Sequence, residues 1–299
     1  MGSICLVTVL RSLVLTIGLS MLSPSHAAPP GPFADWQQFK KEFVGYTAGP
    51  TGIYAIQDMR VLQPSESTAL SSQRKSANAR WITSDGAHRT VTVQYSRGQA
   101  LIFGPGSKRG DLLQQKDGQQ RLANGFIVGA TQHKDALKVW LFNPDLPKLK
   151  GFKGLAYFPF DSRGVVQATF QRKLKPVGVN YLDSRNQSGL MYWVGDVHTK
   201  IGGKQYALRA FNYSADWSNL DHILLLFRDR TSGKTTYGGG RVIEVHFKKG
   251  SPPKNVTLNL NMLYSFLCAH SDFFNCPLNL TTFVDTELAF GEKYQIDHH

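Results

Sequence analysis

The sequence is poor in cysteine and has none of the common catalytic signatures. Cys5, Cys268 and Cys276 are its three cysteines, and its nine histidines are dispersed along the chain. It contains no G-x-S-x-G or H-E-x-x-H motif and no repeat of metal-binding carboxylates. Its run of three glycines, Gly238–Gly240, lacks the Gly-Lys-Ser/Thr ending and the following helix of a P-loop. The motifs therefore predict no cofactor, no nucleotide site and no particular reaction.

Long apolar runs are also absent beyond the N-terminus. The stretch Leu13–Leu22 is apolar, follows Arg11 and precedes small residues, which is typical of a secretory signal peptide over residues 1–27. It is short for a membrane span, and a retained anchor is the alternative. We expect cleavage near Ala27/Ala28 and a periplasmic or secreted protein that meets the membrane only through this leader.

The few cysteines fit an exported protein. Cleavage removes Cys5 and leaves Cys268 and Cys276 as an even pair, which in an oxidising compartment predicts a disulfide. The competing interpretations are free thiols, or a metal site that would add His270 and Asp272. Structural zinc sites usually have a second pair of ligands elsewhere, and no second cysteine pair exists here. We therefore expect a disulfide and no metal.

Acidic residues are scarce relative to basic ones. The chain has 34 Lys and Arg against 21 Asp and Glu, a formal charge of +13 that loss of Arg11 with the leader lowers by one, to +12. Such a charge favours anionic ligands or surfaces. The basic residues are scattered, however, and no motif organises them for nucleic acid. We expect a solvated basic surface and no nucleic-acid partner. The short basic clusters are Lys40-Lys41, Lys108-Arg109, Lys148–Lys153, Arg172–Lys175 and Lys248-Lys249.

Short segments that alternate or concentrate apolar residues dominate the rest of the chain. Trp36, Phe39 and Phe43 are at helical spacing, with Asp35 as an expected N-cap. Strands are predicted at Thr90–Tyr95, Gln99–Phe103, Gly125–Gly129, Ala136–Phe142, Val165–Phe170, Gly189–Val194, Gln205–Phe211, 223–227, Val242–Phe247 and Val256–Leu260. We therefore expect a mainly β protein, residues 28–299 forming a single domain: an antiparallel two-sheet sandwich or a curled half-barrel with an N-terminal amphipathic helix.

The densest group of special residues follows the apolar segment 223–227. A turn rich in Asp, Ser and Gly leads to Gly238–Gly240 and then directly to Arg241. Three glycines at a strand start indicate a bulge, a sharp bend or a close approach by another group. The structural interpretation pairs Arg241 with a carboxylate such as Asp229 or Glu244. The functional interpretation is an anion pocket made of bare backbone and a guanidinium.

This region resembles a bacterial family known as domain-of-unknown-function family 1684. The family pattern is approximately F-x-D-x-T-S-G-x-x-T-Y-G-G-G-R, followed by an L-D-F-N-x-x-Y-N-P-P-C-A segment, a C-P-L and a late A-G-E-K. An F-x-G-x-x-x-F-P-x-D segment lies upstream of it. The resemblance covers residues 135–295 well and the earlier part loosely, and it implies no established activity. The matching strings are Phe152–Asp161, Phe227–Arg241, Leu258–Asn261, Tyr264, Cys268-Ala269, Cys276-Pro277-Leu278 and Gly291-Glu292-Lys293.

The chain departs from the family pattern at several positions. The Asp of the L-D-F-N segment is Asn259 here, the Asp after G-G-G-R is Glu244, and the N-P-P before the first cysteine is Ser265–Leu267. The proline-rich stretch after C-P-L is replaced by Asn279–Thr282. If any member uses the L-D-F-N carboxylate in chemistry, this chain cannot use it in the same way.

Three functions remain open. The first is a binding protein for a small anionic or apolar ligand, or for an envelope component. The second is a hydrolase acting on an envelope ester, glycan or peptide. It would need Ser232 with His222 or His246, or a carboxylate pair. The third is an interaction module that docks through the helix. The candidate ligand-binding residues are Asp229, Thr231, Ser232, Tyr237, Gly238, Gly239, Gly240, Arg241, Glu244, Asn261 and Tyr264.

Overall fold

The computed structural model describes residues 31–72, 74–84, 89–133 and 135–294, so the expected leader lies outside the described residues. The described chain divides into two compact units. The N-terminal unit consists of residues 43–153, and the C-terminal unit consists of residues 31–42 and 154–294.

The N-terminal unit is built from two antiparallel sheets. The first contains β1 (Ile56–Leu62), β9 (Ala136–Phe142), β8 (Ile127–His133) and β7 (Gln119–Arg121) in that order. The second contains β3 (Trp81–Thr83), β2 (Ser67–Leu70), β4 (Thr92–Ser96), β5 (Gln99–Phe103) and β6 (Gly110–Asp111). Alternate residues of both sheets, such as Val93, Ile102, Val128 and Val139, share one core. A short helix, α2 (Pro147–Lys150), follows the last strand.

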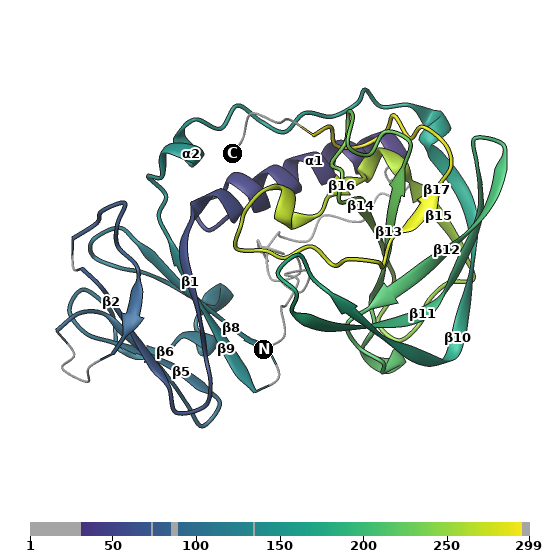
Figure 1. Cartoon of the computed structure of the whole chain (residues 1–299). Coiled ribbons are helices and arrows are strands. Elements are labelled where there is room, and N and C mark those ends of the chain that lie inside the picture. The colour runs from purple at the N-terminus through teal and green to yellow at the C-terminus, as the bar shows by residue number, and fades with distance from the viewer. Residues whose placement is uncertain (1–30, 73, 85–88, 134, 295–299) are drawn as a thin grey trace, which may run out of the picture. The chain divides into compact units, whose positions relative to one another are not determined.

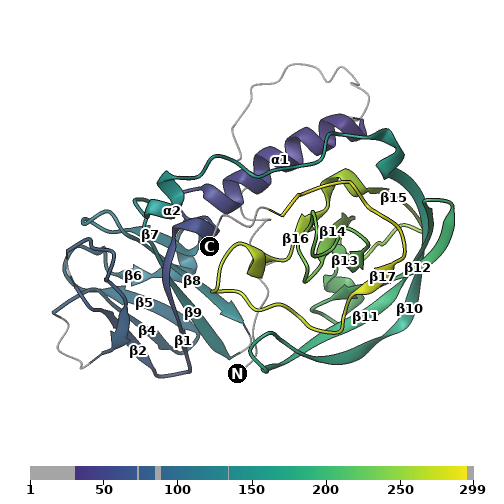
Figure 2. The same cartoon turned by 45° about the horizontal axis from the view of Figure 1, so that its top comes forward.

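The C-terminal unit is one eight-stranded sheet that curls around its own core (Figure 1 and Figure 2). Its order is β15 (Asn255–Asn259), β10 (Val165–Leu182), β11 (Ser188–Ile201), β12 (Lys204–Asn212), β13 (His222–Asp229), β14 (Arg241–His246) and β16 (Tyr264–Ser265). The short strand β17 (Thr282–Val284) pairs in parallel with β13, and the other pairs are antiparallel. Val197, Leu208, Ile223, Leu225 and Phe227 are buried on the inner face.

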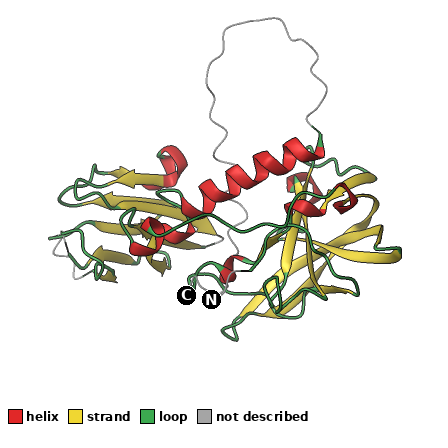
Figure 3. Ribbon diagram, turned by 90° about the horizontal axis from the view of Figure 1, so that it is seen from above, coloured by secondary structure: helices red, strands yellow, loops and turns green. Residues whose placement is uncertain are grey.

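The expected fold class is confirmed. Strands dominate, the sheets are antiparallel and one of them is a curled half-barrel (Figure 3). β5 and β9 have the predicted bounds, whereas β10 extends twelve residues beyond the predicted end at Phe170, to Leu182. The single domain expected over residues 28–299 contains two compact units, each with its own core. If the two units form a single domain, they should unfold together in one cooperative transition. That the chain is a single domain therefore stays a prediction.

Helix α1 (Pro32–Ala48) contributes its first residues to the C-terminal unit and its last to the N-terminal unit. The expected N-cap at Asp35 is wrong, because the helix begins with Pro32, whose fixed φ suits the first helical position. Trp36 and Phe43 are buried, as core packing of the aromatic stripe predicts. Across the described residues, no helix combines the length and the hydrophobicity that a membrane span needs.

Candidate functional site

The glycine-rich segment connects β13 to β14 as the expected hairpin. Phe227 pairs with Arg241, so Arg241 is the first residue of the second strand. Gly240 has a φ of +119°, and a Cβ added there would lie 3.1 Å from the carbonyl oxygen of Phe227 and 3.2 Å from the ring of Phe266. Only glycine fits this position without strain. The conformation and crowding of the backbone therefore account for the third glycine.

Arg241 is fully buried, and its partners belong to the protein itself. Its Nη2 donates to a carboxylate oxygen of Asp229 at 2.8 Å and to the carbonyl of Leu288 at 2.9 Å. Its Nη1 donates to the carbonyl of Phe290. Burial lowers the pKa of Arg241, and Asp229 and Glu292 oppose that shift. The guanidinium therefore joins the hairpin to the C-terminal segment, as the structural interpretation predicts.

Asp229 and the turn residues are occupied in the same network. The other carboxylate oxygen of Asp229 accepts from Thr231 N–H at 2.8 Å and from the Thr231 hydroxyl at 2.5 Å. The Thr231 hydroxyl also lies 2.9 Å from that of Thr236. The Ser232 hydroxyl accepts from Asp229 N–H at 3.0 Å. These hydrogen bonds close the turn and engage both the Ser232 hydroxyl and the Asp229 carboxylate within it.

Glu244, Tyr264 and Asn261 lie in separate contacts. The Tyr264 hydroxyl donates to Glu244 at 2.5 Å, and His246 lies 3.1 Å from the other Glu244 oxygen. Asn261 donates to the Asp161 carbonyl at 2.9 Å and accepts from the Asp161 N–H at 3.0 Å. The predicted ligand-binding residues are thus distributed over several structural networks. No group of three or more metal-binding side chains occurs in the described part of the chain.

Cys268 and Cys276 are joined in a disulfide, with Cα atoms 5.7 Å apart. The hydroxyl of Tyr237 lies 3.4 Å from the sulfur of Cys276 and 3.7 Å from that of Cys268. Burial raises the pKa of Tyr237, with a smaller contribution from Tyr294. Tyr237 is half-buried and packs on this bridge. The atoms nearest to a Cβ added at Gly238 would belong to Gly233, and those nearest to one at Gly239 would belong to the Tyr237 ring.

A buried acid outside the predicted site residues, Glu292, lies close to this network. Glu292 is 3% exposed, accepts from Ser265 N–H at 2.7 Å and lies 3.2 Å from His270. The Gly291-Glu292-Lys293 match was the signal that could have found it. Burial and the charge of Glu292 raise the pKa of Tyr157 well above its usual range. Glu292 thus has a structural role like that of Asp229.

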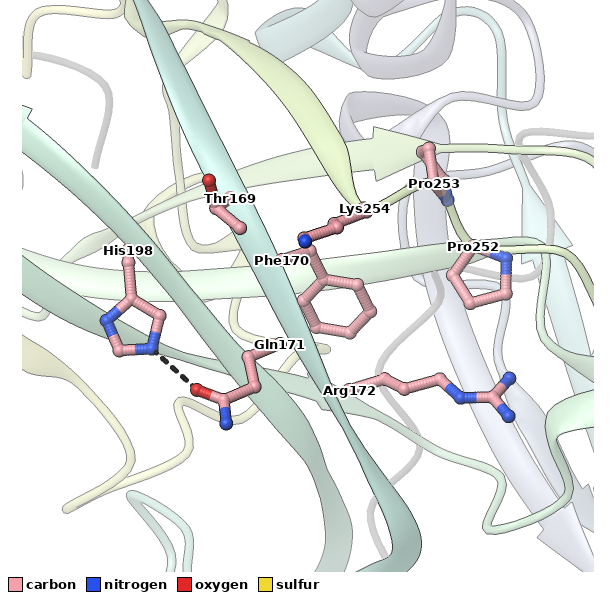
Figure 4. Close-up of a pocket in the computed structure, with 8 residues that line it drawn as sticks. All are labelled: Thr169, Phe170, Gln171, Arg172, His198, Pro252, Pro253 and Lys254. Carbon is pink, nitrogen blue, oxygen red and sulfur yellow. Dashed lines mark hydrogen bonds between the residues drawn. The ribbon is translucent and has the colours of Figure 1, made fainter.

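A surface hollow lies beside β10, away from the glycine-rich hairpin. Its volume is about 530 Å³, and Figure 4 shows the ring of Phe170 at the centre of the lining residues. Gln171 and His198 lie on one side of this ring and share a hydrogen bond of 3.2 Å. Arg172 and Pro252 lie on the other side. The complete lining is Thr169, Phe170, Gln171, Arg172, His198, Pro252, Pro253 and Lys254.

The sheet register brings three distant chain segments into this hollow. Thr169 of β10 pairs with His198 of β11, and Phe170 N–H donates to the carbonyl of Lys254 at 2.7 Å. Phe170 and the two prolines supply apolar surface. Arg172 and Lys254 supply two positive charges, both on exposed residues. A hollow with apolar walls and a few charged groups is the usual form of a small-molecule site.

Aromatic rings covered by cations continue from the hollow along β10. The ring centres of Trp217 and Phe170 lie 6.1 Å apart. The Arg172 guanidinium lies 5.5 Å from the centre of the Trp217 ring. Two cations contact the Trp193 ring: Lys173, 3.6 Å from the ring centre, and Arg209, at 5.0 Å. Cation–π contacts of this kind hold long basic side chains against the surface. Only the cluster Arg172–Lys175 was noted in the sequence, and its aromatic partners were not.

Comparison with known proteins shows that the segment containing this sheet matches a family of unknown function. The family model described as "Protein of unknown function (DUF1684)" matches residues 150–293, which include the whole hollow. The solution NMR structure of an uncharacterised protein from Haloarcula marismortui is similar, with 31% identity over 52% of this chain and 85% of that chain and a TM-score of 0.42. No curated protein matches the chain.

Proposed function

This chain belongs to the DUF1684 family of proteins of unknown function, whose name assigns no activity, and we propose that it is an exported binding protein. Its ligand is a small molecule that combines an anionic group with an apolar part. The binding site is the hollow beside β10. We propose this site in place of the anion pocket that the sequence suggested around Gly238–Gly240 and Arg241.

The observation that supports this site is the composition of the hollow. Phe170, Pro252 and Pro253 can contact an apolar group, while Arg172 and Lys254 can each donate to a carboxylate or phosphate. The volume of about 530 Å³ is in the range of ligand sites. The formal charge of +13 adds a long-range attraction for anions. At Arg241, by contrast, the guanidinium donates to Asp229 and two carbonyls.

The expected leader over residues 1–27 supports export to the periplasm or the medium, and such a location would give access to envelope components. The hydrolase alternative has less support. Ser232 accepts from the backbone of Asp229, Asp229 is paired with Arg241, and Glu244 accepts from Tyr264. The interaction-module alternative relied on an exposed aromatic helix face, and Trp36 and Phe43 are buried.

Calorimetric titration with dodecyl phosphate, an anion with an apolar tail, tests the proposal. Arg172→Gln and Lys254→Gln should each weaken binding about 10- to 100-fold, since a hydrogen bond to a charged group contributes roughly 1.5–3 kcal/mol. Lys234→Gln, an exposed lysine in the β13–β14 turn, is the matched control and should bind normally. Equal affinity in all three variants would rule out the hollow.

A further inference from the structure

Strand β10 leaves the regular ladder just beyond the hollow. Its register against β11 runs to Arg172 and resumes at Val177, and residues 173–176 between them face a single residue of β11. The paired register with β15 has already ended at Thr169. A bulge of this kind leaves its extra residues outside the ladder. Residues 172–177 form the segment that we call the β10 bulge.

The β10 bulge exposes apolar side chains among cations. Leu174 is 86% exposed and Val177 is 46% exposed. Arg172, Lys173 and Lys175 flank them in the sequence Arg-Lys-Leu-Lys-Pro-Val. Because the Leu174 side chain is almost fully exposed to water, its burial contributes almost nothing to the stability of the folded monomer. Exposed apolar side chains flanked by cations are complementary to a partner that is both apolar and anionic.

We propose that the β10 bulge docks on the surface of an anionic lipid bilayer. Leu174 enters the interfacial region, and the surrounding cations contact lipid phosphates. This inference rests on the proposed function and narrows it, because a phospholipid headgroup is an anion attached to an apolar chain. It departs from the expectation that the protein meets a membrane only through its leader.

The bulge and the hollow are continuous. Trp217 contacts Phe170 of the hollow, and its indole N–H donates to the carbonyl of Lys173 at 3.0 Å. Arg172 belongs to both features and lies over the same indole. A headgroup in the hollow would therefore lie beside the side chains that meet the bilayer.

The chemistry of the bulge favours lipid over other anions. A nucleic acid or an acidic glycan could pair with Lys173 and Lys175, but it offers no apolar phase for Leu174. The same pair of strands also exposes Leu182 and Leu190, at 49% and 37%. Apolar anchors next to basic residues are the arrangement by which peripheral proteins hold to anionic membranes.

Vesicle co-sedimentation of the full chain tests the inference. Vesicles of phosphatidylcholine with about one third phosphatidylglycerol should bind the protein, and pure phosphatidylcholine should bind it weakly. Leu174→Ser should reduce the partition coefficient about tenfold, and Lys173→Gln with Lys175→Gln should reduce it by a similar factor. Ile82→Ser is the matched control, because Ile82 is a side chain of the same size that is 40% exposed in the N-terminal unit. This substitution should leave the partition coefficient unchanged.

Dodecyl phosphate titration separates this inference from the proposed function. Leu174→Ser should keep the affinity for soluble dodecyl phosphate while losing vesicles, which would support docking through the bulge. Normal dodecyl phosphate binding without vesicle binding would overturn the bilayer inference and leave the hollow intact. Vesicle binding that Leu174→Ser does not reduce would also overturn it. Failure of both assays in the unmodified protein would remove both proposals.

Discussion

Two arginines of the same curled sheet show opposite environments. Arg241 starts β14, is fully buried and donates to Asp229, Leu288 and Phe290. Arg172 lies on β10, is exposed, and contacts Trp217 beside an open hollow. The first lies in the string that makes the sequence distinctive. The second lies in a short basic cluster that looks like ordinary surface.

The comparison shows that a distinctive sequence motif can be required by the fold itself and need not form a functional site. The hairpin from Phe227 to Arg241 needs a carboxylate at Asp229 and hydroxyls at Thr231 and Thr236, because these groups are buried in one hydrogen-bond network. It needs glycine at position 240 because Phe227 and Phe266 leave no room for a Cβ. Such requirements fix residue identity as strongly as chemistry does. The hollow needs only exposed cations and apolar walls, which many residue combinations supply.

The largest expected effect is the loss of stability on replacing Arg241, compared with the loss on replacing Arg172. Arg241→Ala leaves the carboxylate of Asp229 buried and unpaired and should lower the free energy of unfolding by about 3–5 kcal/mol. Arg172→Ala loses a surface cation–π contact and should cost no more than about 1 kcal/mol. Urea unfolding of both variants measures the difference. Equal stability of the two variants would contradict the assignment of Arg241 to the core.

The disulfide should contribute the next largest effect. Replacing Cys268 and Cys276 together by serine opens a loop with a sequence separation of 8, which should lower the free energy of unfolding by about 2–3 kcal/mol. The bridge contacts Tyr237 of the glycine-rich hairpin and does not line the hollow, so binding of dodecyl phosphate below the unfolding transition should stay unchanged. Loss of binding in the folded double variant would instead link this region to the ligand.

A smaller effect distinguishes two neighbouring glycines. Gly240→Ala introduces a Cβ at positive φ near the carbonyl of Phe227 and should cost about 1–3 kcal/mol. Gly238→Ala is the control, because its nearest neighbour would be the Cα of Gly233 at 3.5 Å. Thermal unfolding of both variants measures the costs. A ligand pocket formed by bare backbone would predict that both substitutions impair binding, and we expect neither to do so.

The smallest effect depends on pH. The hydrogen bonds of Arg230 and Lys204 lower the pKa of Asp285 to about 2. Because the folded pKa is below the ordinary value of 3.8, the stabilisation is present above that value and is lost as pH falls toward 2. Asp285→Asn should flatten the decline of melting temperature between these pH values. An unchanged decline would show that these exposed pairs contribute nothing measurable.

The sequence predicts the local features of this protein well. The strands at Gln99–Phe103 and Ala136–Phe142, the β13–β14 hairpin and the disulfide partners all follow from residue types and spacing within short segments. For Arg241 the sequence offered Asp229 or Glu244 as the paired carboxylate, and the structure has Asp229. Each depends on alternation, turn chemistry or a pairing of charges close in sequence. These are physical rules that act over a few residues.

The hollow could not be predicted in this way. Phe170, His198 and Lys254 come from three segments, and the register of β10 with β11 and β15 alone brings them together. The extension of β10 past Phe170 was missed because Lys173–Pro176 interrupts the alternation expected of a strand. The bulge that exposes Leu174 is the structural result of that interruption.

The most direct test of the account is a map of where an anionic ligand contacts the protein. Amide chemical shifts in a two-dimensional NMR spectrum, followed during titration with dodecyl phosphate, would give this map. We predict that the changes concentrate at Thr169–Arg172, His198 and Lys254. Changes that concentrate at Tyr237–Arg241, with the β10 residues unaffected, would contradict the account and restore the glycine-rich hairpin as the binding site.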